Sequence, residues 1–501
     1  MPGALNELML RNAGAFGLNT EEALAVQDPR WLTSAVNLIY DDSGRLASRK
    51  GLTALTTTGA HSDAVEALHA FLVKGGSNDE IISAGGLKIY SGTTTLTDKT
   101  GAITTPTAND WQFVNYNGSC IGVQQGHPTV SYNALGNFSD LTATTGTTPA
   151  GNAALSAFGR LWIANDNYSS IDWCASLDQL TWQSAGGGSL DVKKVWPDGI
   201  DKITALAEFQ DQLLIFGERS ILVYTGAEDP NATDFALVDI IRKGTRWRDS
   251  VVPAGRDLLF IADDGIRSVS RGLASQNMPL SELSSQVRTK LVSQLDDANL
   301  VQAAYSPVDR AYLLRIKQVD TDFYWYFDLA QRLEDGDMRA IEWHGIDWQS
   351  IAVGSDSTVY LGTTGKVADH SGYQDNGDSY SCSWLTAGTT LEGGEKILKT
   401  ASMQITASAP TTVQIRWQVE LDGIEHSQSV PVNITASPSE WSIAEWGLDE
   451  WSGLVAYTEK VKVPMSRSGS IIQLGARITV DGTKIAFSNA RVLFKLGRIA
   501  A

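Results

Sequence analysis

Three groups of neighbouring carboxylates are the residues of this sequence best suited to chemistry. They are Asp263-Asp264, Asp320 with Asp322, and Glu334-Asp335 with Asp337. Two carboxylates held at a fixed separation can hydrolyse a glycosidic bond, one as the acid and the other as a base or nucleophile. Each group, however, lies beside glycine or in a polar turn, where aspartate commonly accepts hydrogen bonds from nearby amides. The pattern therefore favours turn-forming carboxylates over a catalytic pair.

Other patterns typical of catalysis or ligand binding are missing from the sequence. The six histidines are scattered and form no HExxH motif and no His/Cys cluster: His61, His69, His127, His344, His370 and His426. There is no GxSxG elbow, no Walker loop and no GxGxxG that opens a helix. Gly186-Gly187-Gly188 lacks the following Lys-Ser/Thr of a phosphate-binding loop. We therefore expect no catalytic residue, no metal site and no cofactor.

A basic run between residues 242 and 248 is the one concentrated positive feature. Its charged members are Arg242, Lys243, Arg246 and Arg248. Such a run can contact DNA phosphates or an acidic partner, and these four residues are candidate contacts. The alternative is a solvated loop between two structural units, with Trp247 in the core. Both interpretations stay open.

Short strands separated by polar turns dominate the elements that must position these residues. The segment Phe209–Gly226 contains two short apolar runs around the turn Gly217–Ser220, which predicts a β-hairpin. Units of the same style begin near positions 67, 111, 154, 205, 250, 301 and 350. A period of about 40–50 residues with several strands per unit is typical of β-propeller blades. The sequence thus predicts an all-β fold with a propeller-like repeat body; the alternative is a pair of irregular sandwiches.

Two local patterns fall inside this body. Ser176–Trp182 resembles the Asp-box turn of propellers, although it lacks the glycine and is one residue short, so that an ordinary Asx turn is the alternative. Ser281–Leu295 predicts a helix with a Ser N-cap. Its apolar face consists of Leu283, Val287, Leu291 and Leu295. That stripe carries no polar ligand, and we expect it to pack on the flank of the body.

The strand pattern of the sequence changes near residue 384. Longer alternating strands, over 402–405, 412–420, 471–480 and 484–495, predict a C-terminal antiparallel β-sandwich. The predicted organisation is an N-terminal segment and propeller entry over 1–60, the propeller-like body over 61–380 and the sandwich over 381–501.

Three tryptophans, Trp441, Trp446 and Trp451, lie five residues apart between the predicted strands of the sandwich. This spacing matches neither a strand face nor a helix face and predicts a folded-back loop. The loop is either a second candidate contact surface, for a partner or DNA, or a cap on the sandwich core.

Composition limits the classes of function. The 501 residues are 43% apolar, enough for a large core, and the formal net charge of −18 argues against a protein that coats nucleic acid. The charge is uneven, because residues 385–501 hold 11 basic and 11 acidic residues and residues 1–384 carry the whole excess. Three cysteines, Cys120, Cys174 and Cys382, are too few and too scattered for a disulfide framework.

Targeting segments are not evident in the sequence. No stretch approaches the ~20 apolar residues of a membrane span, and the first residues lack the pattern of a signal peptide. We expect a protein without a membrane span that is made and folded in a cytoplasm.

Several segments together resemble the tail proteins of short-tailed (podovirus) phages. They are Gly17–Glu21, Asn37–Gly51, Phe209–Gly226 with Val251–Ile266, Trp446-Gly447 with Trp451, Arg467–Ser470 and Lys495–Arg498. In that opening an Asn-containing strand leads through an acidic turn to an Arg-x-Gly. The chain is similar to tail nozzle proteins, also described as tail tubular protein B or packaged-DNA stabilisation proteins.

This resemblance implies a structural protein of the virion tail, made in the bacterial host cytoplasm. Such subunits form a homohexameric ring below the portal and its adaptor, contact tail fibres or other tail proteins, retain packaged DNA and conduct it during genome ejection. An acidic wall repels phosphate, so the acidic part of the chain should border the path of the double-stranded DNA. The competing expectation is a β-propeller glycan hydrolase or glycan-binding module.

Overall fold

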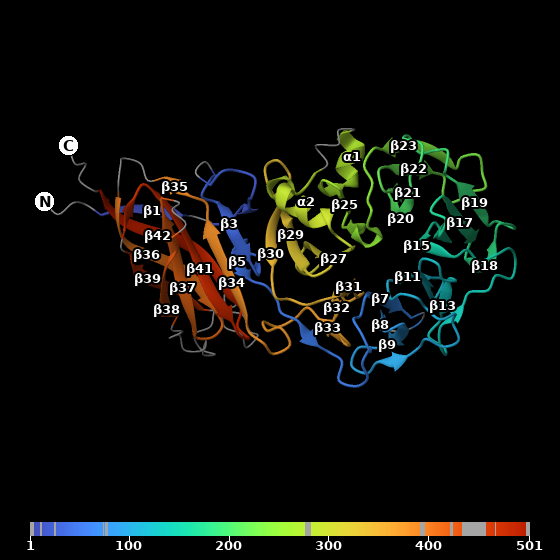
Figure 1. Ribbon diagram of the computed structural model, residues 1–501, viewed down its shortest axis with the longest axis horizontal. Helices are drawn as coiled ribbons and strands as arrows, with labels where there is room; N and C mark the ends of the chain where they lie inside the picture. Colours follow the sequence, from blue (N-terminus) through green and yellow to red (C-terminus); the bar gives the residue numbers. More distant parts are fainter. Residues whose placement is uncertain are drawn as a thin grey trace, which may run out of the picture.

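The computed structural model describes residues 5–496 apart from 11–12, 25–26, 74, 76–78, 276–281, 391–395, 421–423, 433–456 and 466. Within this part the chain is an elongated all-β molecule, with a ring of small sheets at one end and a sandwich at the other (Figure 1). The predicted fold class is confirmed. No described helix is long and apolar enough to cross a membrane.

The first sheets of the ring are antiparallel and follow one another in chain order. Their strands are β7 (Ala67–Leu72), β8 (Asp79–Gly85), β9 (Lys88–Ser91) and β10 (Thr97–Asp98); β11 (Gln112–Tyr116), β12 (Ser119–Val123), β13 (Val130–Tyr132) and β14 (Ser139–Asp140); β15 (Gly151–Ala157), β16 (Arg160–Asn165), β17 (Ser170–Ala175), β18 (Asp178–Trp182) and β19 (Gly188–Asp191); and β20 (Ile203–Phe209), β21 (Gln212–Gly217), β22 (Ile221–Thr225) and β23 (Ala236–Ile241).

The remaining sheets complete the ring. They contain β24 (Val252–Ala254), β25 (Asp257–Ala262) and β26 (Gly265–Ser268); β27 (Leu300–Ser306), β28 (Ala311–Lys317), β29 (Asp322–Arg332) and β30 (Met338–Trp343); and β31 (Ser350–Val353), β32 (Val359–Gly362) and β33 (Val367–Asp369), which pairs with β6 (Thr53–Ala54). The first strands contact one another from β7 to β20 and from β24 to β31, and a 3-10 turn (Arg248–Ser250) contacts β20 and β27 between these two groups. Since β31 also contacts β7, the ring is closed. The early strand β6 thereby joins the last sheet.

Apolar layers between neighbouring sheets hold the propeller together. Central strands such as β21 are buried on both faces, and their side chains pack against the sheets on either side. Burying a large apolar side chain stabilises a fold by roughly 1.5–3 kcal/mol. Short continuous apolar runs bounded by turns are what such doubly covered strands require, and this is why the sequence pattern located them.

The Asp-box-like segment forms a turn and then a strand between two sheets. Asp178 accepts hydrogen bonds from the Leu180 amide at 2.9 Å and the Thr181 hydroxyl at 2.8 Å. Trp182 is fully buried in a cluster shared by the sheets of β12 and β16. The aspartate and the tryptophan therefore act as the Asp-box pattern predicts.

The helical region differs from its prediction at the start. A 3-10 turn (Ser285–Val287) leads into α2 (Arg288–Asp296), and the predicted apolar stripe from Leu283 to Leu295 is buried. The helix begins later than predicted because Glu282 and Leu283 bond to β26. A second helix, α1 (Val269–Ser275), has no counterpart in the sequence predictions.

The sandwich combines strands from both ends of the chain. One sheet contains β1 (Asn6–Leu10), β4 (Leu38–Tyr40), β5 (Leu46–Ser48), β36 (Lys396–Ala407), β39 (Tyr457–Pro464), β40 (Ser468–Gly469) and β42 (Ile485–Leu496). The other contains β2 (Gly17–Leu18), β3 (Trp31–Val36), β34 (Tyr380–Thr386), β35 (Thr389–Thr390), β37 (Thr411–Val419), β38 (His426–Val432) and β41 (Ile471–Val480), and continues through β3 to β30. Strands β1 to β5, between Asn6 and Ser48, are thus structural parts of the sandwich.

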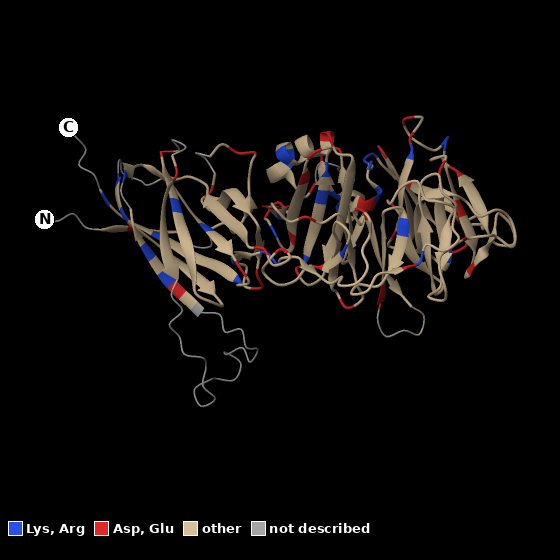
Figure 2. Cartoon of the chain, turned by 60° about the horizontal axis from the view of Figure 1, so that its bottom comes forward, with Lys and Arg blue, Asp and Glu red and all other residues tan. Residues whose placement is uncertain are grey.

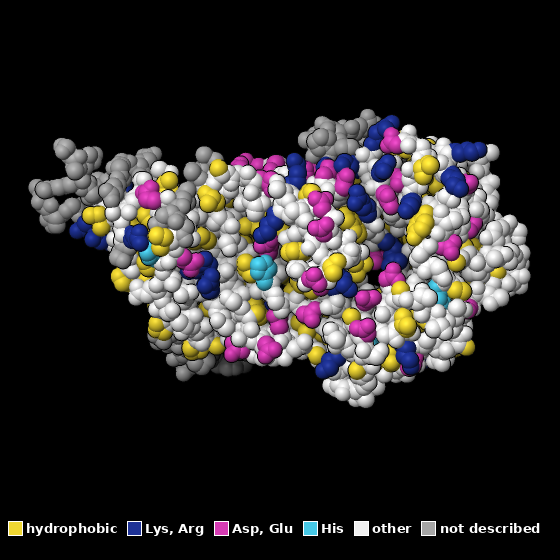
Figure 3. Space-filling view, viewed as in Figure 1, with side chains coloured by type: hydrophobic (Ala, Val, Ile, Leu, Met, Phe, Trp, Pro, Cys, Tyr) yellow, Lys and Arg dark blue, Asp and Glu magenta, His cyan; other side chains and the backbone are white. Residues whose placement is uncertain are grey.

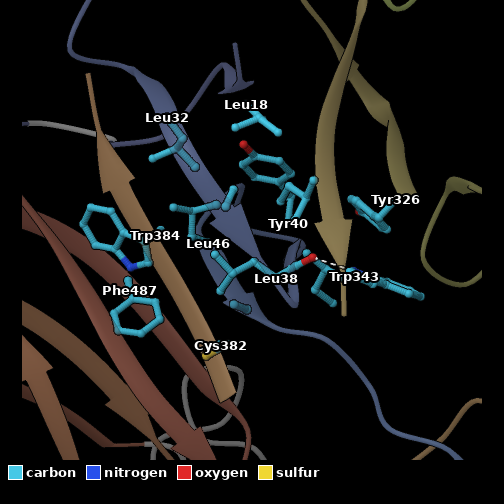
Figure 4. Close-up of a cluster of buried hydrophobic side chains, with 14 of the residues drawn as sticks. Leu18, Leu32, Leu38, Tyr40, Leu46, Tyr326, Trp343, Cys382, Trp384 and Phe487 are labelled. Carbon is cyan, nitrogen blue, oxygen red and sulfur yellow. Dashed lines mark hydrogen bonds between the residues drawn. The ribbon is translucent and has the colours of Figure 1, made fainter. Parts of the chain in front are cut away.

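A continuous apolar core joins the sandwich to the propeller (Figure 4). Leu32, Leu46 and Trp384 lie on the sandwich side, and Tyr326 and Trp343 come from the propeller sheet. The indole of Trp343 donates a hydrogen bond to the carbonyl oxygen of Leu38 at 3.0 Å. Because this core crosses the boundary, the two parts form one packed unit.

Candidate functional site

Arg248 of the basic run lies on the axis of the propeller. It opens a short 3-10 helix (Arg248–Ser250) between β23 and β24. Its guanidinium donates to the carbonyl oxygens of Asn152 and Asp110, at 3.0 and 2.9 Å, and its Nε lies 2.8 Å from the Asp249 carboxylate. These partners belong to the segments that start β15 and β11. Arg248 therefore crosslinks different sheets across the axis.

Two cavities lie on either side of this crosslink. One, of about 290 Å³, is lined by loops that precede the first strands and by turns between second and third strands, including Asn152, Tyr168 and Glu218. The other, of about 460 Å³, is lined by the first strands themselves, including His69 and Gln302. Figure 3 shows the ring hollowed near its centre, with acidic and basic side chains around the hollow.

The smaller cavity has the chemistry of a site for a small polar molecule. The buried Asn152 donates through Nδ2 to the carbonyl of Ile203 at 3.0 Å, but its Oδ1 has no hydrogen-bond partner among the described residues. Buried polar atoms are normally paired, so Oδ1 is an unsatisfied acceptor, but the atom is enclosed by protein and is not presented to the cavity. Lys202 Nζ lies 5.7 Å from the centre of the Tyr168 ring, at the same cavity.

The larger cavity contains a neutral histidine. His69 Nε2 lies 2.9 Å from Asn115 Oδ1. Burial lowers the pKa of His69, and the hydrogen bond to Asn115 opposes this shift only in part. A neutral imidazole can hydrogen-bond a ligand, but no described nucleophile or acid partner completes a catalytic arrangement there.

The other members of the basic run face solvent. Arg242 lies 3.5 Å from Asp198, with both side chains exposed. Lys243 Nζ lies 3.0 Å from Asp263 and 2.9 Å from Asp264. Arg246 is exposed at the rim of the smaller cavity. The run is therefore divided between an axial crosslink and a loop whose charges meet acids, while Trp247 packs partly against the core. A role in contacting a partner or DNA stays a prediction.

The carboxylate groups each have partners of their own. Asp264 bonds Lys243 and Arg267; burial alone would raise its pKa, but these hydrogen bonds lower it. Asp322 pairs with Arg315 at 2.7 Å. In the third group Asp337 accepts from the Ser285 amide, and burial raises its pKa. Asp264, Asp322 and Asp337 are thus engaged by basic side chains or by a neighbouring backbone amide.

Trp441, Trp446 and Trp451, the other candidate contact residues, lie outside the described residues. In the part of the chain that the structure describes, no group of three or more His, Cys, Asp or Glu could hold a metal ion. The expectation of no enzyme and no cofactor stays a prediction.

The axial crosslink contains residues that sequence reasoning missed. Asp110 and Asn152 accept hydrogen bonds from Arg248 through their backbone carbonyls. Because every residue has a backbone carbonyl, the residue types in the sequence could not reveal these two partners. Asp249 was a usable signal, because an acid next to the last arginine of a basic run can neutralise it locally.

Comparisons with known proteins give fold likeness of low degree. No family model matches the chain, and no curated protein matches it. Among solved structures, YCF48 bound to D1 peptide is 12% identical, with a TM-score of 0.37, over 64% of this chain and 97% of that one. The carbohydrate-binding module TmCBM61 in complex with beta-1,4-galactotriose is 11% identical, with a TM-score of 0.15, over 28% of this chain and 70% of that one. Likeness of this degree says nothing about function.

Proposed function

We propose that this chain is a structural subunit of a short-tailed phage tail, a nozzle protein that forms a ring, closes the DNA exit channel and conducts the genome during ejection. The observation that carries the proposal is the position of the Asn37–Gly51 segment, the longest part of the resemblance. It lies where the sandwich meets the propeller, and its polar residues make structural contacts there, with Asn37 also lining a cavity of about 910 Å³ at this junction.

The contacts of that segment are specific. Asn37 donates to the Ser381 carbonyl at 2.8 Å and accepts from Arg49 Nε at 3.1 Å. Arg49 is fully buried and bonds the Asp375 carboxylate through both Nη atoms, at 2.8 and 2.6 Å. Polar groups buried and satisfied in this way fix one geometry between two bodies. A rigid joint of this kind suits a subunit that repeats the same shape around a ring.

The cavities along the axis of the propeller are too small to admit double-stranded DNA. Their volumes of about 290 and 460 Å³ match small molecules, and Arg248 and Asp249 line both cavities. In this proposal the DNA passes through a lumen enclosed by several subunits, and each propeller is a wall element.

Electron microscopy of the purified protein, alone and with portal–adaptor complexes, tests the proposal. We expect closed rings, and labelled protein in purified virions. A protein that forms no ring in either preparation and is absent from virions would refute the proposal.

A glycan-binding module is the second candidate function, and the smaller axial cavity favours it. Tyr168 offers a ring face and the exposed Glu218 offers acceptor oxygens, which is the chemistry a sugar needs. A glycan array followed by calorimetry tests this candidate. Binding that Glu218→Ala abolishes, with the fold intact, supports it, and failure of every glycan to bind removes it.

A further inference from the structure

The outer face of one sandwich sheet is basic and partly apolar. In β39, Val461 and Val463 point into the core, so Lys460, Lys462 and Pro464 point outward. These residues lie opposite Gln404, Ser402 and Thr400 of β36, and Arg491 and Leu493 of β42 lie opposite Ser402 and Thr400. Ile397 and Lys399 are exposed near the start of β36, and Lys495 pairs with Ile397. The basic sheet face is defined by Ile397, Lys399, Lys460, Lys462, Pro464, Arg491, Leu493 and Lys495.

Positive charge prevails on this face. Arg491 is paired with Glu7 at 2.7 Å, whereas no salt bridge with a described residue engages Lys460 or Lys462. Ile397 is 40% exposed beside Lys495, its cross-strand partner. Figure 2 shows Lys and Arg bands on the strands of the sandwich. An apolar strip with lysines around it is the composition of a docking surface for an acidic partner.

The opposite end of the molecule carries the complementary surface. Residues 226–241 contain four acids and no Lys or Arg, and the acids Glu228, Asp229, Asp234 and Asp239 are all exposed. This segment includes β23, whose described partner strand is β22. Leu237 and Val238 are 36% and 51% exposed. An edge strand that presents apolar side chains and acids is open to pairing or docking. We name residues 226–241, which are β23 and the loop before it, the acidic outer strand.

We propose that the basic sheet face of one copy docks on the acidic outer strand of the next copy, head to tail. The two surfaces lie at opposite ends of an elongated chain (Figure 1), so they cannot meet within one copy. A symmetric dimer through either surface would bring like charges together. A head-to-tail contact satisfies both surfaces, and it generates a closed ring or an open filament.

A second copy explains this face better than a nucleic acid does. The charged phosphate backbone gains nothing from contact with the apolar side chains of Ile397, Leu493 and Pro464. The net charge of −18 also repels a polyanion at long range. The same net charge means that another copy is an acidic partner. The inference rests on the proposed ring, for which it names the repeating contact.

Charge-reversal variants of the full chain test the contact. K460E/K462E leaves three cations against two acids on the basic sheet face, and D234K/D239K leaves two acids against two cations on the acidic outer strand. Each variant alone thus loses most of the charge attraction and should assemble at least tenfold more weakly than the wild type by mass photometry. An equimolar mixture should assemble better than either variant, since the unchanged basic face of one variant meets the unchanged acidic strand of the other, and the introduced glutamates face the introduced lysines at the next contact. R256E/K366E reverses two exposed cations outside both surfaces and should assemble like the wild type.

The outcomes separate this contact from the proposed function. Rings or virion incorporation that persist in both charge-reversal variants overturn the contact and leave the nozzle proposal standing. Loss of assembly that the mixture does not restore also overturns the contact, as does a K460E/K462E variant that assembles normally but no longer retains duplex DNA, which would assign the face to phosphate. Thermal melts confirm that each variant folds.

Discussion

Arg49 holds a positive charge where water is excluded. Its guanidinium is fully buried, bonds Asp375 on one side and packs over the ring of Tyr380, with 4.0 Å between the guanidinium carbon and the ring centre. Removing one partner of a buried ion pair leaves the other charge without compensation, which costs far more than the intact pair contributes.

Arg49→Ala should therefore destabilise the chain by about 3 kcal/mol, measured by urea denaturation. Arg30 provides the matched control, because its pair with Asp28 is 2.8 Å long but exposed. Arg30→Ala should change the stability by less than about 1 kcal/mol. Equal effects of the two substitutions would show that the Arg49 pair is not the joint described above.

His370 provides a pH prediction at the same joint. The histidine is buried against Trp343, and Nδ1 lies 3.0 Å from the Gly51 carbonyl oxygen. Burial lowers its pKa from 6.5 to about 4, although the charge of Asp309 works in the opposite direction. The unfolded chain then binds a proton that the folded chain does not, so stability is complete above pH 6.5 and falls as the pH drops toward 4.

The loss over that interval should reach about 3 kcal/mol. Urea midpoints measured from pH 7.5 to 4 check it, with His370→Gln as the comparison. The variant should lose less stability than the wild type over the same range. If the wild type and His370→Gln lose stability in parallel as the pH falls, groups other than His370 dominate the loss of stability in acid.

At the scale of elements, the Arg-x-Gly of the resemblance has a steric explanation. A Cβ on Gly51 would lie 1.9 Å from the carbonyl oxygen of Gln374, whose backbone packs against the segment between β5 and β6. Real Cβ atoms do not approach so closely, so the joint must shift to admit one.

Gly51→Ala should cost about 3 kcal/mol, by the same denaturation assay. Gly345→Ala is the control, because Gly345 has a φ of +74° but open space around its Cβ position. At that position the substitution costs only the strain of an alanine in a left-handed backbone conformation, which is about 1 kcal/mol. A Gly51→Ala protein as stable as the Gly345→Ala protein would contradict a close-packed joint.

The strands of the propeller were predictable from the sequence, whereas the contact between the sandwich and the propeller was not. Strands starting at 67, 112, 151, 203, 252, 300 and 350 lie within three residues of the predicted starts, because each is a local apolar run after a polar turn. The pairing of β3 with β34 has no local signal, since paired residues such as Val36 and Ser383 are more than 300 positions apart. Arg248 was singled out by its charge, but its axial position depends on carbonyls of distant sheets.

At the scale of the whole molecule, the sandwich needs both ends of the chain. Without β1 and β3–β5, β42 keeps only β36 as a partner and β34 keeps only β41, and side chains such as Phe487 and Trp384 lose part of their cover. We therefore expect residues 381–501 alone to stay unfolded, and residues 1–50 joined to them by a flexible linker to fold. Circular dichroism and thermal melting of both fragments decide this. A cooperative melt of the shorter fragment would contradict the expectation.

The shared sandwich also sets an order of events during synthesis. Strand β3 leaves the ribosome long before β34, which is 344 positions away at Asn37 and Ser381. At roughly 5–20 residues per second, the first strands wait about 20–70 s for their partners. During that time the sheets of the propeller emerge in chain order and can pack, while the early apolar strands stay available to chaperones. The sandwich, which contains the N-terminal strands, is therefore the last part of the molecule to be completed.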